Sequence, residues 1–264
     1  MPRLDAADCA ALMDDLTKVA AQAARTILGL AATTDMRRKA DGSPVTAADE
    51  AAEAVICEAL QRLTPTVPVI SEERAAREKP QTIRRGSYFL VDPLDGTREF
   101  IAGRTEYTVN IALMTDGIPL GGVICAPAQA AFWRGIVGQG AERIEGLSPG
   151  AAKSIRARPR PPDAPLIMVS RSHLDSQTQT YVGRFAHAEL VQSGSSIKFC
   201  RLAEGAADLY PRLAPTRDWD VAAGHAILKA AGGEVTAPDG SPLRYGSDEL
   251  LIPAFIASGQ ALTA

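Results

Sequence analysis

The sequence has little of what marks membrane, disulfide-rich or polymer-binding proteins. No apolar run approaches the roughly 20 residues that cross a bilayer. The four cysteines, Cys9, Cys57, Cys125 and Cys200, show no paired spacing and lie in apolar or helical stretches. This pattern predicts reduced core residues, with disulfides or metal ligation as the alternative. The formal net charge of −3 gives no indication of a nucleic-acid polymer or a membrane surface as partner.

The first residues also lack the apolar core of a signal peptide, because residues 1–5 turn acidic and helical at once. We therefore expect the protein in the cytoplasm. What is present is ordinary for a globular protein: 264 residues, of which 46% are hydrophobic and 22% charged. A chain of this length can bury a large core in one or two domains. No internal repeat is evident.

The hydrophobic pattern predicts a mixed α/β chain. Apolar residues at helical spacing indicate helices near 5–32, 46–63, 175–185, 196–203 and 218–231. Short apolar runs indicate strands near 67–70, 88–91, 107–113, 120–125, 132–137, 166–169, 189–192, 206–210, 234–236 and 255–257. Prolines and basic residues gather in 146–165, which predicts a boundary there. We expect an N-terminal α+β half, residues 1–150, and a C-terminal α/β half, residues 151–264.

The stretch that carries the most chemistry is Val91-Asp92-Pro93-Leu94-Asp95-Gly96-Thr97, which follows a predicted buried strand. Asp92 and Asp95 stand on either side of a proline that restricts the backbone. Clustered carboxylates repel one another, and their removal from water is costly, so a cation that holds them together explains the arrangement. Oxygen-only ligation favours Mg²⁺ over zinc. The alternative is an Asp-Pro turn whose second aspartate caps the next helix.

Other acids also have both a structural and a functional interpretation. Thr46 and Asp49 resemble a capping box, with Asp in place of the usual Glu, and capping alone would explain Asp49. Glu72 and Glu73 follow a predicted strand, as Asp92 does. Adjacent glutamates commonly form a solvated turn. In an α/β layer, however, the two strand ends could meet at the same edge of the sheet.

Four signatures follow one another along the chain and together resemble one protein family. They are Asp41-Gly42-Ser43-Pro44-Val45-Thr46-Ala47-Ala48-Asp49, Ser71-Glu72-Glu73, Asp92-Pro93-Leu94-Asp95-Gly96-Thr97 and Trp219-Asp220-Val221-Ala222-Ala223-Gly224. In this order they are similar to the lithium-sensitive, magnesium-dependent phosphatase superfamily that includes inositol monophosphatase and fructose-1,6-bisphosphatase. The resemblance spans about residues 10 to 260. It implies the layered α-β-α-β-α sugar-phosphatase fold, whereas composition and periodicity alone indicate mixed α/β.

The resemblance also implies a site with two Mg²⁺ ions, with a third left open. One ion would be held by Glu72, Asp92 and the carbonyl of Leu94, and the other by Asp92, Asp95 and Asp220. In the family, the residues that match Thr97 and Asp49 take the proton from the attacking water. The family residues that contact substrate near the metals match Glu72, Leu94, Asp95, Gly96, Thr97 and Asp220.

Within the superfamily, the stretches around 194–200, 203–205, 209–212 and 219–225 are similar to the CysQ-type 3′(2′),5′-bisphosphate nucleotidases. That branch hydrolyses adenosine 3′,5′-bisphosphate, a by-product of sulfate assimilation, to AMP and phosphate. Near Arg212 the inositol phosphatases carry a glutamate that binds sugar hydroxyls, and a cation there suits a second phosphate. The nucleotide contacts that the branch implies are His173, Ser195, Lys198 and Arg212.

Several alternatives stay open at this point. His173 could lie in a surface loop, and Arg212 could pair with a neighbouring acid such as Glu204. An inositol or other sugar monophosphatase would share every metal ligand. An inactive metal- or nucleotide-binding protein is expected where a ligand or the Thr97–Asp49 pair is replaced, and none is. The expected partner is a small nucleotide bisphosphate bound by a monomer or homodimer.

Overall fold

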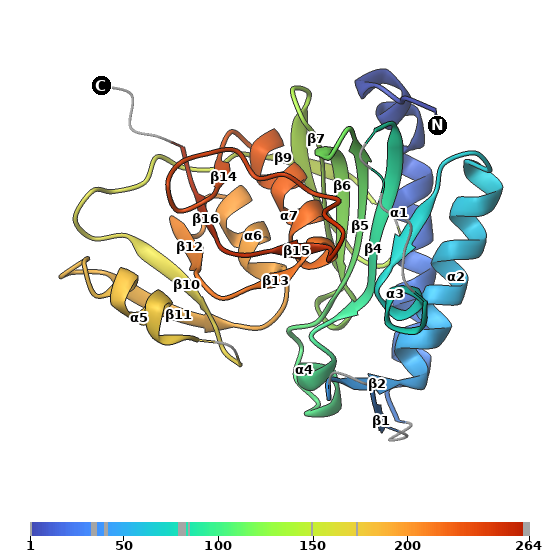
Figure 1. Cartoon of the computed structure of the whole chain (residues 1–264), viewed down its shortest axis with the longest axis horizontal. Helices are drawn as coiled ribbons and strands as arrows, with labels where there is room; N and C mark the ends of the chain where they lie inside the picture. Colours follow the sequence, from blue (N-terminus) through green and yellow to red (C-terminus); the bar gives the residue numbers. More distant parts are fainter. Residues whose placement is uncertain are drawn as a thin grey trace.

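The computed structural model describes residues 2–32, 36–39, 42–78, 83, 85–148, 150–172 and 174–260. Five layers follow one another across the molecule (Figure 1): two helices, a seven-stranded sheet, two central helices, a five-stranded sheet and a short outer helix. The expected α-β-α-β-α arrangement is confirmed. Its basis is that each sheet has apolar side chains on faces that helices cover.

The first layer consists of α1 (Ala6–Gly29) and α2 (Ala47–Leu63), which contact each other and the large sheet. Asp5 caps α1 by accepting hydrogen bonds from backbone N–H groups of the first turn. Between the two helices, β1 (Met36–Arg38) and β2 (Pro44–Thr46) form a small antiparallel hairpin that the sequence analysis did not predict. The hairpin leads directly into α2, and so it determines where Asp49 lies.

The seven-stranded sheet has its strands in chain order from β3 to β9. Only β3 and β4 are parallel, and the other neighbours are antiparallel. The strands are β3 (Val69–Ser71), β4 (Ser87–Asp95), β5 (Thr108–Thr115), β6 (Ile118–Ala126), β7 (Ala131–Ile136), β8 (Gly140–Glu145) and β9 (Ala152–Ile155). A single-turn 3-10 segment, η1 (Pro127–Gln129), joins β6 to β7. The strands β8 and β9 are not evident from the sequence, because they are polar, partly exposed and contain no apolar run.

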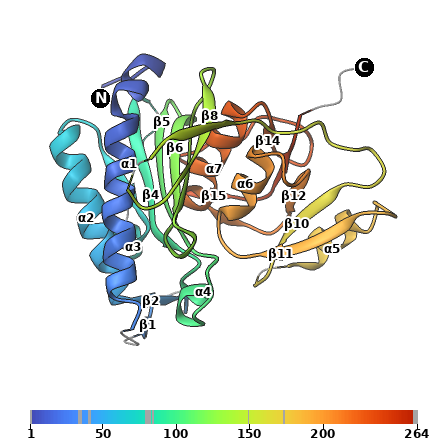
Figure 2. The ribbon, with the colours of Figure 1, turned by 180° about the vertical axis from the view of Figure 1, so that it is seen from behind.

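Two central helices, α6 (Ile197–Ala203) and α7 (Asp218–Ala230), lie between the two sheets, on the face of the large sheet opposite α1 and α2 (Figure 2). The backbone of α7 approaches β6 very closely. A Cβ atom added at Gly122 would lie 2.8 Å from the carbonyl oxygen of Ala223, so this contact requires glycine. The close approach holds the first turn of α7, which carries Asp220, against the large sheet.

The five-stranded sheet has the order β11-β10-β12-β16-β14, with α5 (Ser176–Val182) on its outer side. Its strands are β10 (Leu166–Ser170), β11 (Glu189–Ser193), β12 (Leu209–Arg212), β14 (Glu234–Thr236) and β16 (Phe255–Ser258). A separate ribbon pairs β13 (Thr216–Arg217) with β15 (Leu251–Ile252). Along the chain, the last strand of the seven-stranded sheet ends at Ile155 and the first strand of the five-stranded sheet begins at Leu166. The helix α7 comes later in the chain and still packs on the seven-stranded sheet.

Two expectations about composition can be compared with the structure. All four cysteines are buried and unpaired, which agrees with the prediction of reduced core residues. None of the helices in the described part of the chain combines the length and the apolar character that crossing a membrane requires. The division into residues 1–150 and 151–264 stays a prediction.

Candidate active site

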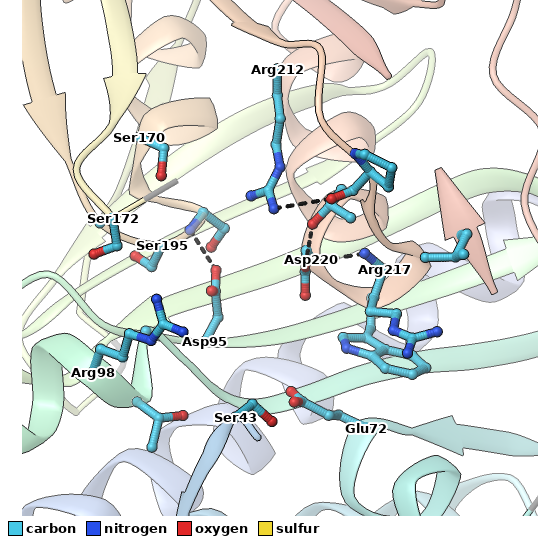
Figure 3. A pocket seen from close by; sticks show the side chains of 18 of the residues that line it. Ser43, Glu72, Asp95, Arg98, Ser170, Ser172, Ser195, Arg212, Arg217 and Asp220 are labelled. Carbon is cyan, nitrogen blue, oxygen red and sulfur yellow. Dashed lines mark hydrogen bonds between the residues drawn. The ribbon is translucent and has the colours of Figure 1, made fainter. Parts of the chain in front are cut away.

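A cavity of about 510 Å³ opens between the end of β4 and the five-stranded sheet. Both halves of the chain contribute to its lining, as Figure 3 shows: Glu72 and Asp95 come from the N-terminal half, and Ser195, Arg212 and Asp220 from the C-terminal half. The implied site residues that line it are Glu72, Asp95, Gly96, Thr97, Ser195, Lys198, Arg212 and Asp220. The remaining ones, Asp49, Asp92 and Leu94, are buried behind this lining, and His173 lies outside the described residues.

The strand β4 contains an irregularity that aims two aspartates at one place. Side chains i and i+3 of a regular strand point to opposite faces of the sheet. In the pairing of β4 with β5, Asp92 lies opposite Asn110 and Asp95 opposite Thr108, so three steps on β4 match two on β5. This extra residue is a β-bulge, and it coincides with Pro93, which has no N–H to donate to the ladder. The bulge brings Asp92 and Asp95 into electrostatic contact.

The parallel pairing of β3 with β4 brings Glu72 to the same edge. Ser71 lies opposite Val91 in the register, so the next residues, Glu72 just after β3 and Asp92 within β4, lie side by side. Instead of the solvated turn that was the alternative, Glu72 starts the short helix α3 (Glu72–Arg77). Asp220 approaches from the opposite direction, at the third position of α7, where it accepts hydrogen bonds from the Thr216 hydroxyl and from the Arg217 backbone N–H at 3.2 Å.

The negative charges of this cluster disfavour ionisation. Burial, followed by the charges of Glu72, Asp95 and Asp220, raises the pKa of Asp92 well above its usual value. Burial and the charge of Asp220 raise the pKa of Asp95 to about 7. Burial likewise raises the pKa of Glu72. Repulsion among these four carboxylates in a buried place therefore favours the binding of added positive charge.

The donor set fits a hard cation, because it consists of carboxylate oxygens and a backbone carbonyl. As the side chains stand, no three His, Cys, Asp or Glu residues in the described ranges converge closely enough to enclose a metal ion. Three of the ligand candidates instead have protein partners: Glu72 contacts Lys39, Asp95 contacts the Ser196 backbone, and Asp220 contacts Thr216. Loading a metal would exchange some of these partners.

Lys39 is the cation closest to the cluster, and the sequence analysis assigned it no role. Its ammonium lies 2.7 Å from Oε1 of Glu72 and 2.6 Å from Oε1 of Glu73, and its side chain is only 8% exposed. Burial lowers the pKa of Lys39, but the charge of Glu72 and the hydrogen bonds to both glutamates outweigh that effect and raise it. The signal in the sequence is its place two residues ahead of Asp41, where the first signature begins.

Thr97 and Asp49 meet as the resemblance implied. The Thr97 hydroxyl lies 3.0 Å from Oδ1 of Asp49 and 3.2 Å from the carbonyl oxygen of Leu94. Asp49 is buried, and burial raises its pKa against the opposing hydrogen bonds from Thr46 and Thr97. Gly96 precedes Thr97 at the start of the short helix α4 (Thr97–Ile101) and adopts φ +92°, a conformation that favours glycine. The hydroxyl thus reaches the cavity while bonded to a buried carboxylate.

The opposite wall of the cavity is cationic. Lys198 is 2% exposed, and its ammonium donates to the carbonyls of Ser193 at 3.2 Å and Ser195 at 2.5 Å while lying over the Tyr210 ring. Arg212 donates to the carbonyl of Pro215 at 3.4 Å, and its buried Nε atom has no partner among the described residues.

Arg212 does not pair with Glu204, which was the alternative. Glu204 instead accepts from three side chains outside the cavity, Trp133, Arg143 and Arg201. Glu204 therefore does not draw Arg212 away from the cavity, and the guanidinium lies in the cavity wall, as Figure 3 shows.

Further residues of the site were not predicted. Asn110 and Ser196 hydrogen-bond to Asp95, and Arg98 and Arg217 line the cavity. Asn110 carried a signal that went unused: it is a polar residue in the middle of the apolar run 107–113. A buried polar side chain in a central strand needs a partner, and here that partner is the acid cluster.

The five-layered fold and the acidic cavity at its strand ends are those of a sugar-phosphatase-like α/β protein. The model of the inositol monophosphatase family matches residues 7–263. With nearly the whole chain matched, the protein belongs to the inositol monophosphatase family.

Individual relatives show which members of this family the chain resembles. The chain is 46% identical over 226 residues to the 3′(2′),5′-bisphosphate nucleotidase CysQ of Escherichia coli strain K12, covering 85% of this chain and 89% of that protein. It superimposes on the crystal structure of CysQ from Bacteroides thetaiotaomicron with a TM-score of 0.76 and 40% identity, covering 92% and 95% of the two chains. The inositol monophosphatase of Anabaena (Nostoc) sp. PCC 7120 gives a TM-score of 0.77 at 26% identity, covering 97% and 93%.

Proposed function

We propose that this protein is a magnesium-dependent 3′(2′),5′-bisphosphate nucleotidase that converts adenosine 3′,5′-bisphosphate to AMP and phosphate. The observation that carries the proposal is one cavity with an acidic wall able to hold Mg²⁺ and a cationic wall suited to a second phosphate. The 46% identity to a protein named as this nucleotidase supports it. As one step in clearing a by-product of sulfate assimilation, the reaction belongs in the cytoplasm.

The acid cluster is the proposed place for two Mg²⁺ ions. Glu72, Asp92 and the Leu94 carbonyl would hold one ion, and Asp92, Asp95 and Asp220 would hold the other. When bound, Mg²⁺ supplies activation of the attacking water and stabilisation of the leaving oxygen. The charge of two ions balances the four carboxylates, so a phosphate dianion that the bare acids would repel can enter.

The protein's own proton acceptor is the Thr97–Asp49 pair. The Thr97 oxygen faces the cavity while its hydrogen is donated to Oδ1 of Asp49 at 3.0 Å. When a water molecule gives its proton to the Thr97 oxygen, Thr97 can release its own proton to the Asp49 carboxylate, which already accepts that hydrogen bond. Because Asp49 is buried, its pKa is raised, which brings its basicity closer to that needed near neutral pH.

The proposed place for the 5′-phosphate is the wall that carries Ser195, Lys198 and Arg212. The planar guanidinium of Arg212 can contact two phosphate oxygens at once. Lys198 donates two of its three N–H groups to backbone carbonyls, and these bonds hold the loop that carries Ser195. The third N–H group is left for a ligand. With the second phosphate held there, the 3′-phosphate is directed toward the acid cluster. The unit that acts is a monomer or a homodimer.

A comparison of substrates tests the proposal. Phosphate release is measured with and without Mg²⁺ from adenosine 3′,5′-bisphosphate, 3′-AMP and inositol 1-phosphate, with Asp92→Asn as the inactive control. We expect Mg²⁺-dependent release, with the highest kcat/KM on the bisphosphate, and none from Asp92→Asn. A higher kcat/KM on inositol 1-phosphate would assign a sugar phosphatase instead. No release from any of the three would assign a binding protein without this activity.

A further inference from the structure

The carboxylate of Asp95 is held by donors that come from both halves of the chain. Its Oδ2 atom accepts from the backbone N–H of Ser196 at 2.6 Å and from Nδ2 of Asn110 at 3.4 Å. Asn110 belongs to β5 of the large sheet, while Ser196 immediately precedes α6 in the C-terminal half. The orientation of Asp95 is therefore determined by how the two halves meet.

A buried chain of hydroxyl groups fixes the orientation of the Asn110 amide. The Ser196 hydroxyl lies 2.7 Å from Oδ1 of Asn110 and 2.8 Å from the Thr108 hydroxyl. Because Oδ1 can only accept, Ser196 donates to Asn110, and Thr108 must then donate to Ser196. The order of donation is thus Thr108 to Ser196 to Asn110 to Asp95. All three donor residues are at most 2% exposed, so water does not compete for these bonds.

The position of this chain relative to the bulge gives it a specific task. In the strand register, Thr108 lies opposite Asp95 and Asn110 lies opposite Asp92. The chain of hydrogen bonds therefore runs across the bulge in β4. Neither Thr108 nor Asn110 is among the described residues that line the cavity, so neither meets a substrate directly. Their effect on the site passes through Asp95.

We propose that Asn110 and Ser196, with Thr108 behind them, are positioning residues that hold Asp95 in the orientation needed to bind metal. The inference rests on the proposed function, in which Asp95 ligates Mg²⁺. Carboxylates that ligate metals are themselves held by hydrogen bonds, and removing such a partner costs about 10–100-fold in metal affinity. The C-terminal half thus completes the metal site through Ser196 as well as through Asp220.

The test measures Mg²⁺ binding to the full chain by calorimetry, together with the Mg²⁺ dependence of activity. Asn110→Ala removes one donor to Asp95 and should weaken Mg²⁺ binding about 10–100-fold. Ser196→Ala keeps the backbone donor and frees only the amide of Asn110, so its loss should be smaller. In both variants kcat at saturating Mg²⁺ should return to within about threefold of the wild type, because neither side chain is among the proposed substrate contacts.

Two milder variants keep the test decisive if the alanine variants fold poorly. Thr108→Val removes the first donor of the chain at nearly constant volume and should weaken Mg²⁺ binding measurably, whereas Thr108→Ser keeps the hydroxyl and should restore it. Thr17→Val is the matched control, since it removes a buried hydroxyl whose partners, the Met13 carbonyl and the Arg134 side chain of β7, do not belong to the acid cluster. It should lower the melting temperature without changing Mg²⁺ binding.

The outcomes separate this inference from the proposed function. If the wild type binds Mg²⁺ and the Asn110, Ser196 and Thr108 variants bind it equally well, the positioning role is overturned and the proposed function stands. If the variants bind Mg²⁺ weakly and the wild type lacks nucleotidase activity, the proposed function fails and the positioning role stands. Absence of Mg²⁺ binding by the wild type would overturn both.

Discussion

The Thr97 hydroxyl donates to Oδ1 of Asp49 at 3.0 Å, while Oδ2 of the same carboxylate accepts from the backbone N–H of Thr46 at 2.8 Å and from its hydroxyl at 2.6 Å. Capping and catalysis were alternative interpretations of Asp49 in the sequence. The geometry is compatible with both, because a carboxylate has two oxygen atoms, one bonded to the start of α2 and one to the Thr97 hydroxyl. The cap holds the carboxylate still, and this fixes the direction in which Thr97 points.

This pair leads to a prediction about the proton acceptor. Thr97→Ala should lower kcat by about 10²–10⁴, the usual contribution of a positioned acid–base group. Mg²⁺ affinity should change less, because the hydroxyl is not among the proposed ligands. Thr97→Ser keeps the hydroxyl and serves as the control, with most of the activity retained. Steady-state kinetics at saturating Mg²⁺ decides the matter: equal loss in both variants would mean that the hydroxyl is not the active group.

A second prediction concerns substrate discrimination. Arg212→Ala should lower kcat/KM on adenosine 3′,5′-bisphosphate at least tenfold, because hydrogen bonds to a charged partner contribute about 1.5–3 kcal/mol. Activity on 3′-AMP, which lacks the 5′-phosphate, should barely change. Part of the loss can appear in kcat, since remote binding energy aligns the reacting phosphate. Arg201→Ala, which removes a guanidinium paired with Glu204, is the control. Equal losses on the two substrates would contradict the assignment of Arg212.

A third prediction links Mg²⁺ binding to pH. Burial and the charge of Asp220 raise the pKa of Asp95 to about 7, so in the metal-free protein this group is largely protonated at pH 6 and ionised at pH 8. A raised carboxyl pKa stabilises the fold at low pH, and that contribution is lost as pH rises through about 7. Mg²⁺ needs the ionised form, so its affinity should rise about tenfold from pH 6 to pH 8, with proton release at pH 6. Calorimetry in two buffers of different ionisation enthalpy measures the Mg²⁺ affinity and the number of protons released. An affinity that does not change between pH 6 and pH 8 would argue against Asp95 as a ligand.

A fourth prediction concerns Lys39. Lys39→Met leaves Glu72 and the buried Glu73 without their ammonium partner, so the Mg²⁺-free protein should lose up to about 3 kcal/mol of unfolding free energy. The loss is limited because burial already raises the pKa of Glu73 to about 7, and protonation can relieve the charge. Mg²⁺ binding should become tighter, since no ammonium competes for Glu72.

The control for Lys39 is Lys18→Met, which breaks the exposed pair with Asp15 and should change the free energy of unfolding far less than Lys39→Met does. Chemical denaturation with EDTA and with Mg²⁺ gives both quantities. Weaker Mg²⁺ binding by Lys39→Met would mean that Lys39 supports the metal site and does not compete with it.

A fifth prediction concerns acid stability away from the cavity. His225 is buried with Nδ1 2.9 Å from the Tyr245 hydroxyl, and burial followed by the charge of Lys229 lowers its pKa to about 3. In the unfolded chain this histidine binds a proton as pH falls below about 6.5, whereas in the folded chain it stays neutral until about pH 3. The free energy of unfolding therefore falls as pH drops below about 6.5. Between pH 7.5 and 5.5 the wild type should lose about 1.4 kcal/mol more than His225→Gln, as measured by urea unfolding. Parallel losses would mean that His225 ionises readily in the fold.

The four signatures, read as a sequence, determined the family and the fold, and hydrophobic periodicity located most of the helices and the buried strands. These features are local: a strand such as 88–91 is recognised by its own apolar run, and Thr46 with Asp49 by a capping pattern four residues long. The order of the signatures along the chain is equally a property of the sequence. Each could therefore be read without knowing what the segment packs against.

Only the tertiary structure decided how the acids are aimed and what holds them. The bulge between Asp92 and Asp95 arises from the register of β4 against β5, and the bonds from Ser196 and Asn110 to Asp95 join residues far apart in the chain. Lys39 became part of the site because the hairpin of β1 and β2 sets it against Glu72. Such partners depend on how sheets and helices pack, and a local pattern of residues carries no record of that packing.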